Sequence, residues 1–370
     1  MRVGLLIYGD MESVSGGYLY NRKLVSYLRN QGDSVQIISL PPRHYWQHLG
    51  DNFDNAFFAQ IIAAEIDVLI QDAMVHPSVF LLNYRLRKKI NIPIITLVHL
   101  LTTFDFHPFY SRPFYRFIER RYFQSVAGMI VNSQTTLSQI KALLPACVPS
   151  HCVAVPAGDN FPDVNVNLKQ LQQKIFHSQT LKILVVGNVI FRKGLHILIH
   201  ALHELADENF LVTIAGRLDM EPRYTREVQE LVETFQLQKQ VVFKGIIQGN
   251  ELASLYQENH LMVLPSAYES YGIVYVEAQQ FGLPVIGTTA GAAKEIITHA
   301  ENGYLIPPEN SHALAELLQT LQNDRALLFT LSQNALASYA QHPRWADSCE
   351  IIRYYIIKLS ELQQTSCRVF

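Results

Sequence analysis

The sequence has few cysteines, no long apolar run and little net charge. Its four cysteines, at positions 147, 152, 349 and 367, form no C-x-x-C pair and no zinc-binding spacing. They are typical of a reducing compartment, where free thiols behave as small hydrophobic groups. No segment approaches the roughly 18 apolar residues of a membrane-spanning helix. A net charge of −2 argues against bulk nucleic-acid binding. We expect a cytoplasmic protein, soluble or peripheral at the cytoplasmic membrane face.

Two cofactor fingerprints are also missing. A nicotinamide-dependent oxidoreductase should show G-x-G-x-x-G after an opening strand. Neither Gly9–Glu12 nor Gly187–Ile190 supplies that spacing, although each follows a predicted opening strand. A phosphate-binding loop of the G-x-x-x-x-G-K type is absent as well. These absences exclude two common uses of an α/β sheet, but they do not exclude the sheet itself.

Length and composition predict two α/β domains. At 370 residues the chain is longer than one core usually serves, and 49% hydrophobic with 17% charged residues describe a globular protein with large buried sheets. Apolar runs alternate with amphipathic stretches, which is typical of βαβ units. The run Met1–Tyr8 is too short for a signal peptide and acidic residues follow it, so we expect a strand there. The predicted strands of the first domain are Val3–Tyr8, Ser34–Ser39, Val68–Ile70, Ile94–Val98 and Gly128–Val131.

A second opening strand is predicted at Leu181–Gly187. It follows a polar stretch, 160–180, that we interpret as a linker with one short helix. We place the domains at 1–165 and 178–345, with an amphipathic helix over 346–370. The later strands of the second domain are predicted at Phe210–Ala215, Val241–Lys244, Leu261–Leu264, Val285–Gly287 and Tyr304–Ile306.

The segment Pro265–Ala278 carries the most specific pattern in the chain. It places Glu269 and Glu277 eight positions apart across a strand end, a tight turn and the start of a helix. In a doubly wound sheet, the carboxyl end of a strand opens onto the ligand crevice. Taken alone, two glutamates near a glycine favour the alternative of a loop carboxylate and a solvated helix residue, because exposed carboxylates are common. Between them, three backbone amides would form a helix N-terminus and hence an anion site: those of Ser270, Tyr271 and Gly272.

This stretch resembles the E-x7-E signature of retaining glycosyltransferases with the GT-B fold, glycosyltransferase family 4 in particular. The resemblance implies an α/β protein with two Rossmann-like, doubly wound domains facing a central cleft, and a C-terminal helix that crosses back onto the first domain. It also implies that Glu269 contacts the sugar of a nucleotide-diphosphate sugar and that Glu277 holds the ribose hydroxyls. The resemblance covers most of residues 1–360 and is strongest from 181 to 310.

Two cations follow the opening strand of the second domain. Arg192 and Lys193 lie at a βα junction, where positive charge can neutralise a diphosphate. A basic helix start in solvent is the alternative, although cations oppose the dipole of a helix N-terminus. The family commonly reads Gly-Arg, four other residues, then Lys-Gly, and this chain has Asn188 where the Arg usually stands. The resemblance implies that Lys193 stabilises the leaving diphosphate, with Arg192 as the residue that would supply the missing charge.

Two features of the first domain resemble the same family. Gly16 and Gly17 follow the first strand and open a helix, and paired glycines allow positive φ and close backbone approach to a ligand. They look like the Gly-Gly loop that reaches the donor phosphate. A tight turn that binds no ligand would show the same sequence pattern. His99 ends the strand Ile94–Val98, where family members often carry a His that contacts the donor sugar. A structural His is the alternative, and the His-Asp pair of many relatives is missing, which leaves the partner of His99 open.

The resemblance therefore implies a retaining, hexosyl-type transferase that moves a sugar from a nucleotide-sugar donor to an acceptor hydroxyl of a glycan, lipid or small molecule. No D-x-D metal motif occurs in the sequence, so we expect neither a metal nor a cofactor beyond the donor. A sugar-nucleotide epimerase and a nonenzymatic nucleotide-sugar-binding protein of the same fold stay open. A transferase would consume donor only with acceptor present, whereas an epimerase would interconvert the free nucleotide sugar.

Two aromatic segments of the first domain bear on the acceptor. Phe109–Tyr122 is also basic, and helices of this kind can rest on anionic membranes, which would give the first domain a peripheral membrane contact. An ordinary amphipathic helix with a solvated basic face is the alternative. Pro41–His48 would either stack on a sugar acceptor or form a packed loop.

Overall fold

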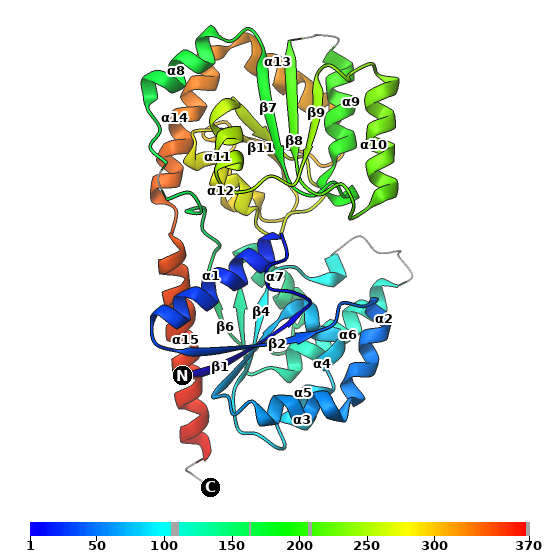
Figure 1. Cartoon of the computed structure of the whole chain (residues 1–370), viewed down its shortest axis with the longest axis vertical. Coiled ribbons are helices and arrows are strands. Elements are labelled where there is room, and N and C mark those ends of the chain that lie inside the picture. Colours follow the sequence, from blue (N-terminus) through cyan, green and yellow to red (C-terminus); the bar gives the residue numbers. More distant parts are fainter. Residues whose placement is uncertain (105–110, 163, 206–208, 368–370) are drawn as a thin grey trace. The chain divides into compact units, whose positions relative to one another are not determined.

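The computed structural model describes residues 1–104, 111–162, 164–205 and 209–367. The chain forms two compact units, Met1–Pro156 with Pro343–Phe370, and Ala157–His342. Figure 1 shows the helices and strands of each unit. The sequence predicts a first domain over 1–165 and a second over 178–345. The second unit instead begins at Ala157 and ends at His342, both earlier than predicted.

The described part of the first unit contains a six-stranded parallel sheet in the order β2-β1-β3-β4-β5-β6. The strand β1 lies beside both β2 and β3, so the order reverses there, and the carboxyl ends of these strands form the switch point of a doubly wound sheet. The strands are β1 (Arg2–Tyr8), β2 (Ser34–Leu40), β3 (Val68–Asp72), β4 (Ile94–Val98), β5 (Gly128–Val131) and β6 (Ser150–Val153).

Helices cover this sheet, and α1 illustrates how the sequence sets their ends. The Ser15 hydroxyl caps the first turn by accepting the Tyr18 N–H, and Gly32 follows the last turn with φ of +80°, a conformation that glycine adopts without strain. The helices of this unit are α1 (Gly16–Asn30), α2 (Tyr45–His48), α3 (Asn55–Ala63), α4 (His76–Val79), α5 (Leu82–Leu86), α6 (Arg112–Ser125), α7 (Gln134–Leu143), α15 (Trp345–Cys367) and the 3-10 turns η1 (Leu49–Phe53), η2 (Ala73–Val75) and η3 (Thr102–Phe104).

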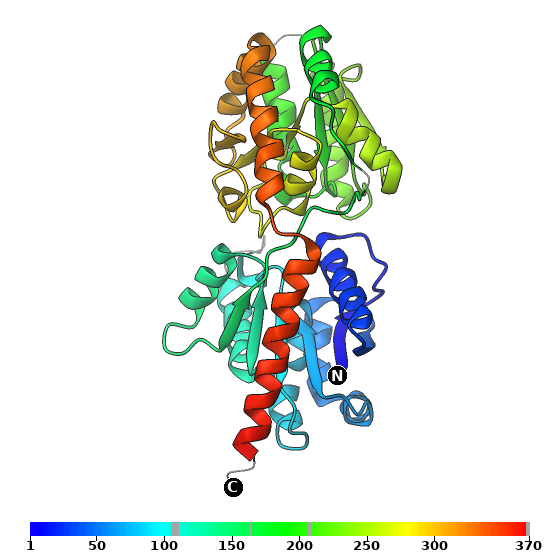
Figure 2. The same ribbon diagram turned by 90° about the vertical axis from the view of Figure 1, so that its left-hand side faces the viewer.

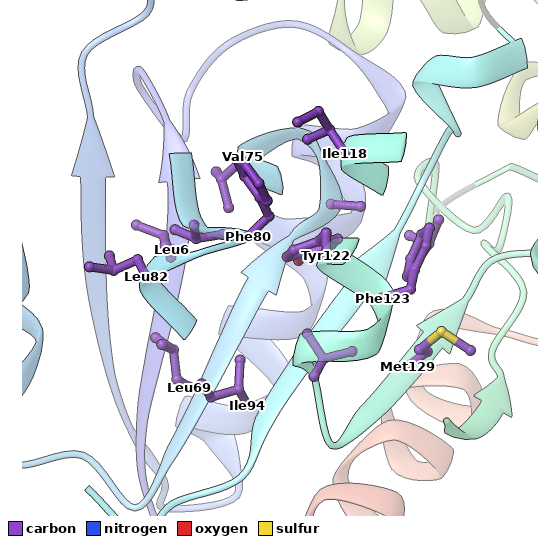
Figure 3. Packing of buried hydrophobic residues seen from close by; sticks show 14 of the residues in the cluster. Leu6, Leu69, Val75, Phe80, Leu82, Ile94, Ile118, Tyr122, Phe123 and Met129 are labelled. Atoms are coloured by element: carbon purple, nitrogen blue, oxygen red, sulfur yellow. The ribbon is translucent and has the colours of Figure 1, made fainter. Parts of the chain in front are cut away.

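The core of the first unit lies between the sheet and α6. Figure 3 shows Leu6, Leu69, Ile94 and Met129 of the strands together with Ile118, Tyr122 and Phe123 of α6. Each such side chain contributes roughly 1.5–3 kcal/mol when it leaves water. This burial orients α6 so that its remaining face points outward.

The C-terminal helix α15 belongs to the first unit. Figures 1 and 2 show it running beside β6 and α1. Arg353 forms an ion pair with the buried Asp33 at 2.7 Å, and Tyr355 Oη accepts the Met129 N–H at 3.1 Å. A Cβ at Gly128 would lie 2.4 Å from Tyr355 Oη, so a glycine is needed for this approach. The helix therefore completes a unit whose strands lie more than 190 residues earlier in the sequence.

The described part of the second unit contains another six-stranded parallel sheet, in the order β12-β11-β10-β7-β8-β9. Its order reverses at β7, so the switch point lies at the carboxyl ends of β7 and β10. The strands are β7 (Leu181–Val186), β8 (Phe210–Ala215), β9 (Val241–Gly245), β10 (Leu261–Val263), β11 (Val285–Thr288) and β12 (Gly303–Ile306).

The polar stretch 160–180 is part of this second unit rather than a free linker. Its helix α8 contacts α14, and Leu171 and Ile175 are buried. The helices of the unit are α8 (Leu168–His177), α9 (Leu195–Leu205), α10 (Pro222–Thr234), α11 (Gly249–Glu258), α12 (Ile273–Gln280), α13 (Ser311–Asn323), α14 (Arg325–Gln341) and the 3-10 turns η4 (Phe191–Lys193) and η5 (Ala293–Glu295).

Candidate functional site

The switch point of the second unit brings the turn η4 against the segment that follows β10. Gly194 ends η4 in the left-handed conformation, with φ of +68°, and a Cβ there would lie 2.1 Å from the Pro265 carbonyl oxygen. The Ala267 N–H donates to the Arg192 carbonyl at 2.8 Å. Because only a glycine permits this approach, the Lys-Gly pair of the sequence motif has a direct structural reason.

Lys193 and Arg192 both reach the carboxylate of Glu269. Lys193 Nζ donates to Glu269 Oε1, and Arg192 Nη1 lies 4.0 Å from the same oxygen. Ser266 Oγ donates to it as well, at 2.8 Å. All three charged side chains are at most 18% exposed, so water screens them little. Two cations and one carboxylate leave the cluster with a net positive charge.

Backbone contacts fix Glu269 from the other side. The Ala292 N–H donates to the Glu269 carbonyl at 2.8 Å, and a Cβ at Gly291 would lie 2.0 Å from that oxygen. Burial disfavours the charge of Glu269, but the attraction of Lys193 and Arg192 outweighs it, so the pKa of Glu269 lies below its ordinary value. The carboxylate therefore stays ionised at neutral pH.

Glu277 lies on α12 in a separate polar contact. It is 6% exposed, so it is not the solvated helix residue that the pattern also allowed. Tyr256 Oη donates to Glu277 Oε2 at 2.8 Å, and Asn160 Nδ2 donates to Oε1 at 2.6 Å. Sequence reasoning missed both donors, since nothing local marks a residue that lies 21 or 117 positions away.

The start of α12 corrects one prediction. The helix begins at Ile273 with Gly272 as its N-cap residue, at φ of +106°. The first-turn amides are therefore those of Ile273 and Val274, and Ser270 and Tyr271 precede the helix. The Tyr271 side chain is buried and its hydroxyl lies 3.1 Å from His342 Nε2. Gly272 has a left-handed backbone at this turn, a conformation that a glycine adopts without strain.

The two further polar residues near η4 have local partners. Asn188 Oδ1 accepts the N–H of Arg217 at 3.2 Å, which joins the ends of β7 and β8. The Arg217 guanidinium forms a half-exposed pair with Asp219 at 2.8 Å. Arg217 thus contacts an acidic neighbour at the surface.

In the first unit, His99 lies beside the start of α1. Gly16 and Gly17 are ordinary helical residues without positive φ, so that part of the prediction is wrong. The close approach is real at Gly17, where a Cβ would lie 3.1 Å from His99 Cδ2. His99 Nε2 lies 3.0 Å from Asn21 Oδ1 and 3.7 Å from Asp72 Oδ2.

Asp72 is the acidic partner that the sequence did not reveal. It ends β3 at the switch point, accepts a hydrogen bond from Asn21 Nδ2 at 2.8 Å and accepts another from the Met74 N–H at 2.9 Å. Burial lowers the pKa of His99, and the Asp72 carboxylate partly opposes this effect. The position of Asp72 at the end of a buried strand was the available signal.

The predicted site residues therefore fall into three groups. Lys193, Arg192 and Glu269 form one cluster, and Glu277 forms its own contact on α12. Gly16, Gly17 and His99 lie together in the first unit. Within the described ranges, no three His, Cys, Asp or Glu side chains are grouped as metal ligands. No helix in that part of the chain is long and apolar enough to cross a membrane.

Comparison with known proteins finds a family that resembles the second unit. Residues 168–341 match the family model described as glycosyl transferases group 1. The matched region contains Lys193, Glu269 and Glu277. An uncharacterised glycosyltransferase of Methanocaldococcus jannaschii is 31% identical to this chain over 164 residues, which span 44% of this chain and 41% of that relative.

Solved structures show that this chain has the GT-B fold. Sucrose-phosphate synthase from Thermosynechococcus elongatus aligns with a TM-score of 0.81 and 20% identity, over 97% of this chain and 98% of that one. The Anabaena protein HepE in complex with UDP and glucose aligns with a TM-score of 0.74 and 20% identity, over 96% of this chain and 99% of that one. At this identity the likeness establishes the fold alone.

Proposed function

We propose that this chain is a retaining glycosyltransferase that moves a hexosyl group from a nucleotide-diphosphate sugar to an acceptor hydroxyl, without a metal ion. The observation that carries the proposal is the contact of Lys193 and Arg192 with Glu269 at the switch point of the second unit. A buried cluster with net positive charge suits a diphosphate, because departure of the nucleotide adds negative charge to it in the transition state.

Each member of the cluster has a separate part in the reaction. Lys193 and Arg192 stabilise the leaving diphosphate, and they supply the charge that a divalent metal would otherwise supply. Glu269 contacts the transferred sugar and holds Lys193 in place when no donor is bound. Glu277 accepts hydrogen bonds from the ribose hydroxyls. The acceptor hydroxyl attacks from the face that the nucleotide leaves, and a leaving phosphate oxygen takes its proton.

The donor is a uridine diphosphate sugar in this proposal. HepE, which shares the fold, is described with UDP and glucose, and this supports uracil as the base and a hexose as the sugar. We also assign a contact with the donor sugar to His99, whose ring is held by Asn21 and Asp72.

The acceptor is proposed to be lipid-linked, because of the outer face of α6. Phe117 is 53% exposed there, with the Arg121 guanidinium 5.6 Å from its ring centroid. Trp46 of α2 is also 53% exposed and lies 4.8 Å from Phe114. A basic face with exposed aromatics suits an anionic membrane surface. Phe109 and Tyr110 of the predicted segment lie outside the described residues. The arginines exposed on α6 are Arg112, Arg116, Arg120 and Arg121.

A ligand screen followed by product analysis tests the function. Thermal unfolding of the full chain is measured with UDP, GDP and ADP and with their glucose conjugates, because a ligand that binds the folded state raises its apparent stability. UDP-glucose should give the largest shift. Donor consumption that requires an added lipid-linked or sugar acceptor supports transfer. Interconversion of the free nucleotide sugar without acceptor would favour an epimerase, and stabilisation without turnover over an acceptor panel would favour a binding protein.

A further inference from the structure

The carboxylate of Glu277 is held by two donors from distant parts of the second unit. Tyr256 on α11 is fully buried and donates to one oxygen, while Asn160 donates to the other. Burial raises the pKa of Tyr256 well above its ordinary value, and the charge of Glu277 adds to this effect. The phenol therefore keeps its proton and remains a donor. With one donor on each oxygen, rotation of the carboxylate would break both hydrogen bonds.

Close packing of the chain on α12 places Asn160. A Cβ at Gly158 would lie 2.5 Å from Val276 Cγ1 and 2.9 Å from the Val276 backbone carbon. The Asn160 N–H donates to the Gly158 carbonyl at 2.8 Å, which turns the chain so that the Asn160 side chain faces Glu277. A larger residue at position 158 would lift this segment from the helix.

An aromatic cluster places Tyr256. Its ring stacks on Phe281 at a centroid distance of 5.1 Å, and the Phe161 ring packs edge-on against both. Gln280 Nε2 donates to the Phe161 carbonyl at 2.7 Å. The residues that surround Glu277 are therefore fixed by packing before any ligand arrives.

We propose that Tyr256 and Asn160 are positioning residues that aim the Glu277 carboxylate at the ribose of the donor nucleotide. This inference rests on the proposed function, which assigns the ribose hydroxyls to Glu277. A glutamate that is free in solution loses rotamer freedom when it binds a ligand, and a side chain held in advance has already lost it. The two donors therefore increase the affinity for a nucleotide with ribose hydroxyls without touching the nucleotide themselves.

The test separates positioning from a general structural role by removing the hydroxyls from the ligand. Dissociation constants of UDP and 2′,3′-dideoxy-UDP are measured by calorimetry with the full chain, Tyr256→Phe and Asn160→Ala. The parent should bind UDP more tightly than the dideoxy analogue. Each variant should lose about five- to tenfold in UDP affinity and keep the affinity for the analogue, since one hydrogen bond to a charged group is removed. A purely structural role would weaken both ligands equally.

Two matched variants control for the loss of a buried polar group. Tyr122→Phe removes a buried hydroxyl that bonds to Thr96 in the first unit, and Asn259→Ala removes a buried amide that bonds to the Leu255 carbonyl. Neither should change the ratio of the two affinities.

Each remaining outcome overturns either this inference alone or this inference together with the proposed function. Equal binding of UDP and the analogue by the parent would overturn both the ribose role of Glu277 and this inference. If the parent discriminates and both variants discriminate as strongly, positioning fails and the proposed function stands. No binding of either nucleotide would overturn both.

Discussion

The two units place an acid at the same point of the sheet and surround it with opposite chemistry. Each opening strand, β1 or β7, lies at a reversal of strand order, and an acidic residue lies at or beyond the carboxyl end of the neighbouring strand across that reversal. In the first unit the acid is Asp72, which contacts the Asn21 amide, the Met74 N–H and His99. In the second it is Glu269, which contacts Lys193 and Arg192.

This difference teaches that the fold supplies the position and the neighbouring side chains supply the chemistry. Two cations over one carboxylate attract a polyanion such as a diphosphate. An imidazole, an amide and a carboxylate suit hydroxyl groups, because together they offer donors and acceptors at modest charge. Under the proposed function, the second unit therefore binds the nucleotide and the first contacts sugar hydroxyls.

The largest effect should come from removing a cation at the second switch point. Lys193→Ala is expected to lower kcat/KM for sugar transfer by about 100- to 1,000-fold, since charge stabilisation of the leaving group is lost in a buried site. Steady-state kinetics with UDP-glucose and acceptor measure this. Lys244→Ala, an exposed lysine on β9, should leave transfer unchanged. If kcat/KM of Lys193→Ala stayed within threefold of the parent value, the proposed difference in chemistry between the two units would be wrong.

The buried glutamates of the two units should respond to pH in opposite directions. Glu119 on α6 accepts the Thr103 N–H at 3.0 Å, and burial raises its pKa to about 7. Because this value lies above the ordinary 4.5, the contribution of Glu119 to stability is complete at low pH and is lost as pH rises through about 7. Glu269 has a lowered pKa, so its contribution is lost as pH falls.

Tryptophan fluorescence can report the first unit alone, since Trp46 and Trp345 are the two tryptophans of the chain and both belong to it. Urea unfolding followed in this way should show a loss of up to about 3 kcal/mol between pH 5 and pH 8. Glu119→Gln should flatten this dependence, whereas Glu230→Gln on α10 should not. An unchanged slope in Glu119→Gln would show that another group causes it.

A smaller effect is expected from the acid of the first unit. The Asp72 carboxylate opposes the lowering of the His99 pKa by burial, so Asp72→Asn should lower that pKa further. If neutral His99 is the active form, the acid limb of the pH profile of kcat/KM moves to lower pH, and activity at neutral pH falls about tenfold through lost orientation of the ring. If the acid limb of the Asp72→Asn profile did not move, Asp72 would not be the group that opposes the lowering of the His99 pKa.

The smallest effect concerns the outer helices. The face of α6 exposes arginines, whereas α10 exposes mixed charges, such as the Arg223–Glu227 pair at 3.2 Å. Arg120→Gln should weaken binding to phosphatidylglycerol vesicles about fivefold in a sedimentation assay, in line with about 1 kcal/mol per cation. Arg226→Gln on α10 should have no effect. Equal binding of the parent to phosphatidylcholine vesicles would contradict the membrane role.

Buried strands could be predicted from the sequence because their residues leave a continuous apolar signal. Ile94–Val98, Gly128–Val131 and Phe210–Ala215 have the predicted bounds, and nearly every residue in them is buried. Strand β6 was missed because it lies at the sheet edge and reads Ser-His-Cys-Val, half exposed and without an apolar run. A single sequence carries no signal for such a strand.

The candidate site was predictable where a motif is local. Lys193-Gly194 and the Glu269 segment each sit directly after a predicted strand, and the sheet order brings the two together. The partner Asp72 of His99 left one signal, its place at the end of a buried strand, but nothing local pairs it with His99. Asn160, a partner of Glu277, lies in a segment without any motif, and only the three-dimensional packing makes the two residues neighbours.

The return of the chain to the first unit at Pro343 has a consequence for recombination between proteins. The second unit is one unbroken stretch of sequence, whereas the first is completed only by α15. Ser348 Oγ donates to the Val155 carbonyl at 2.6 Å, so the two ends of the interruption lie together within the first unit. The second unit is thus an insertion with two closely spaced junctions. Under the proposed function, a donor specificity can therefore be exchanged as one continuous segment, while an acceptor specificity has to be moved in two pieces.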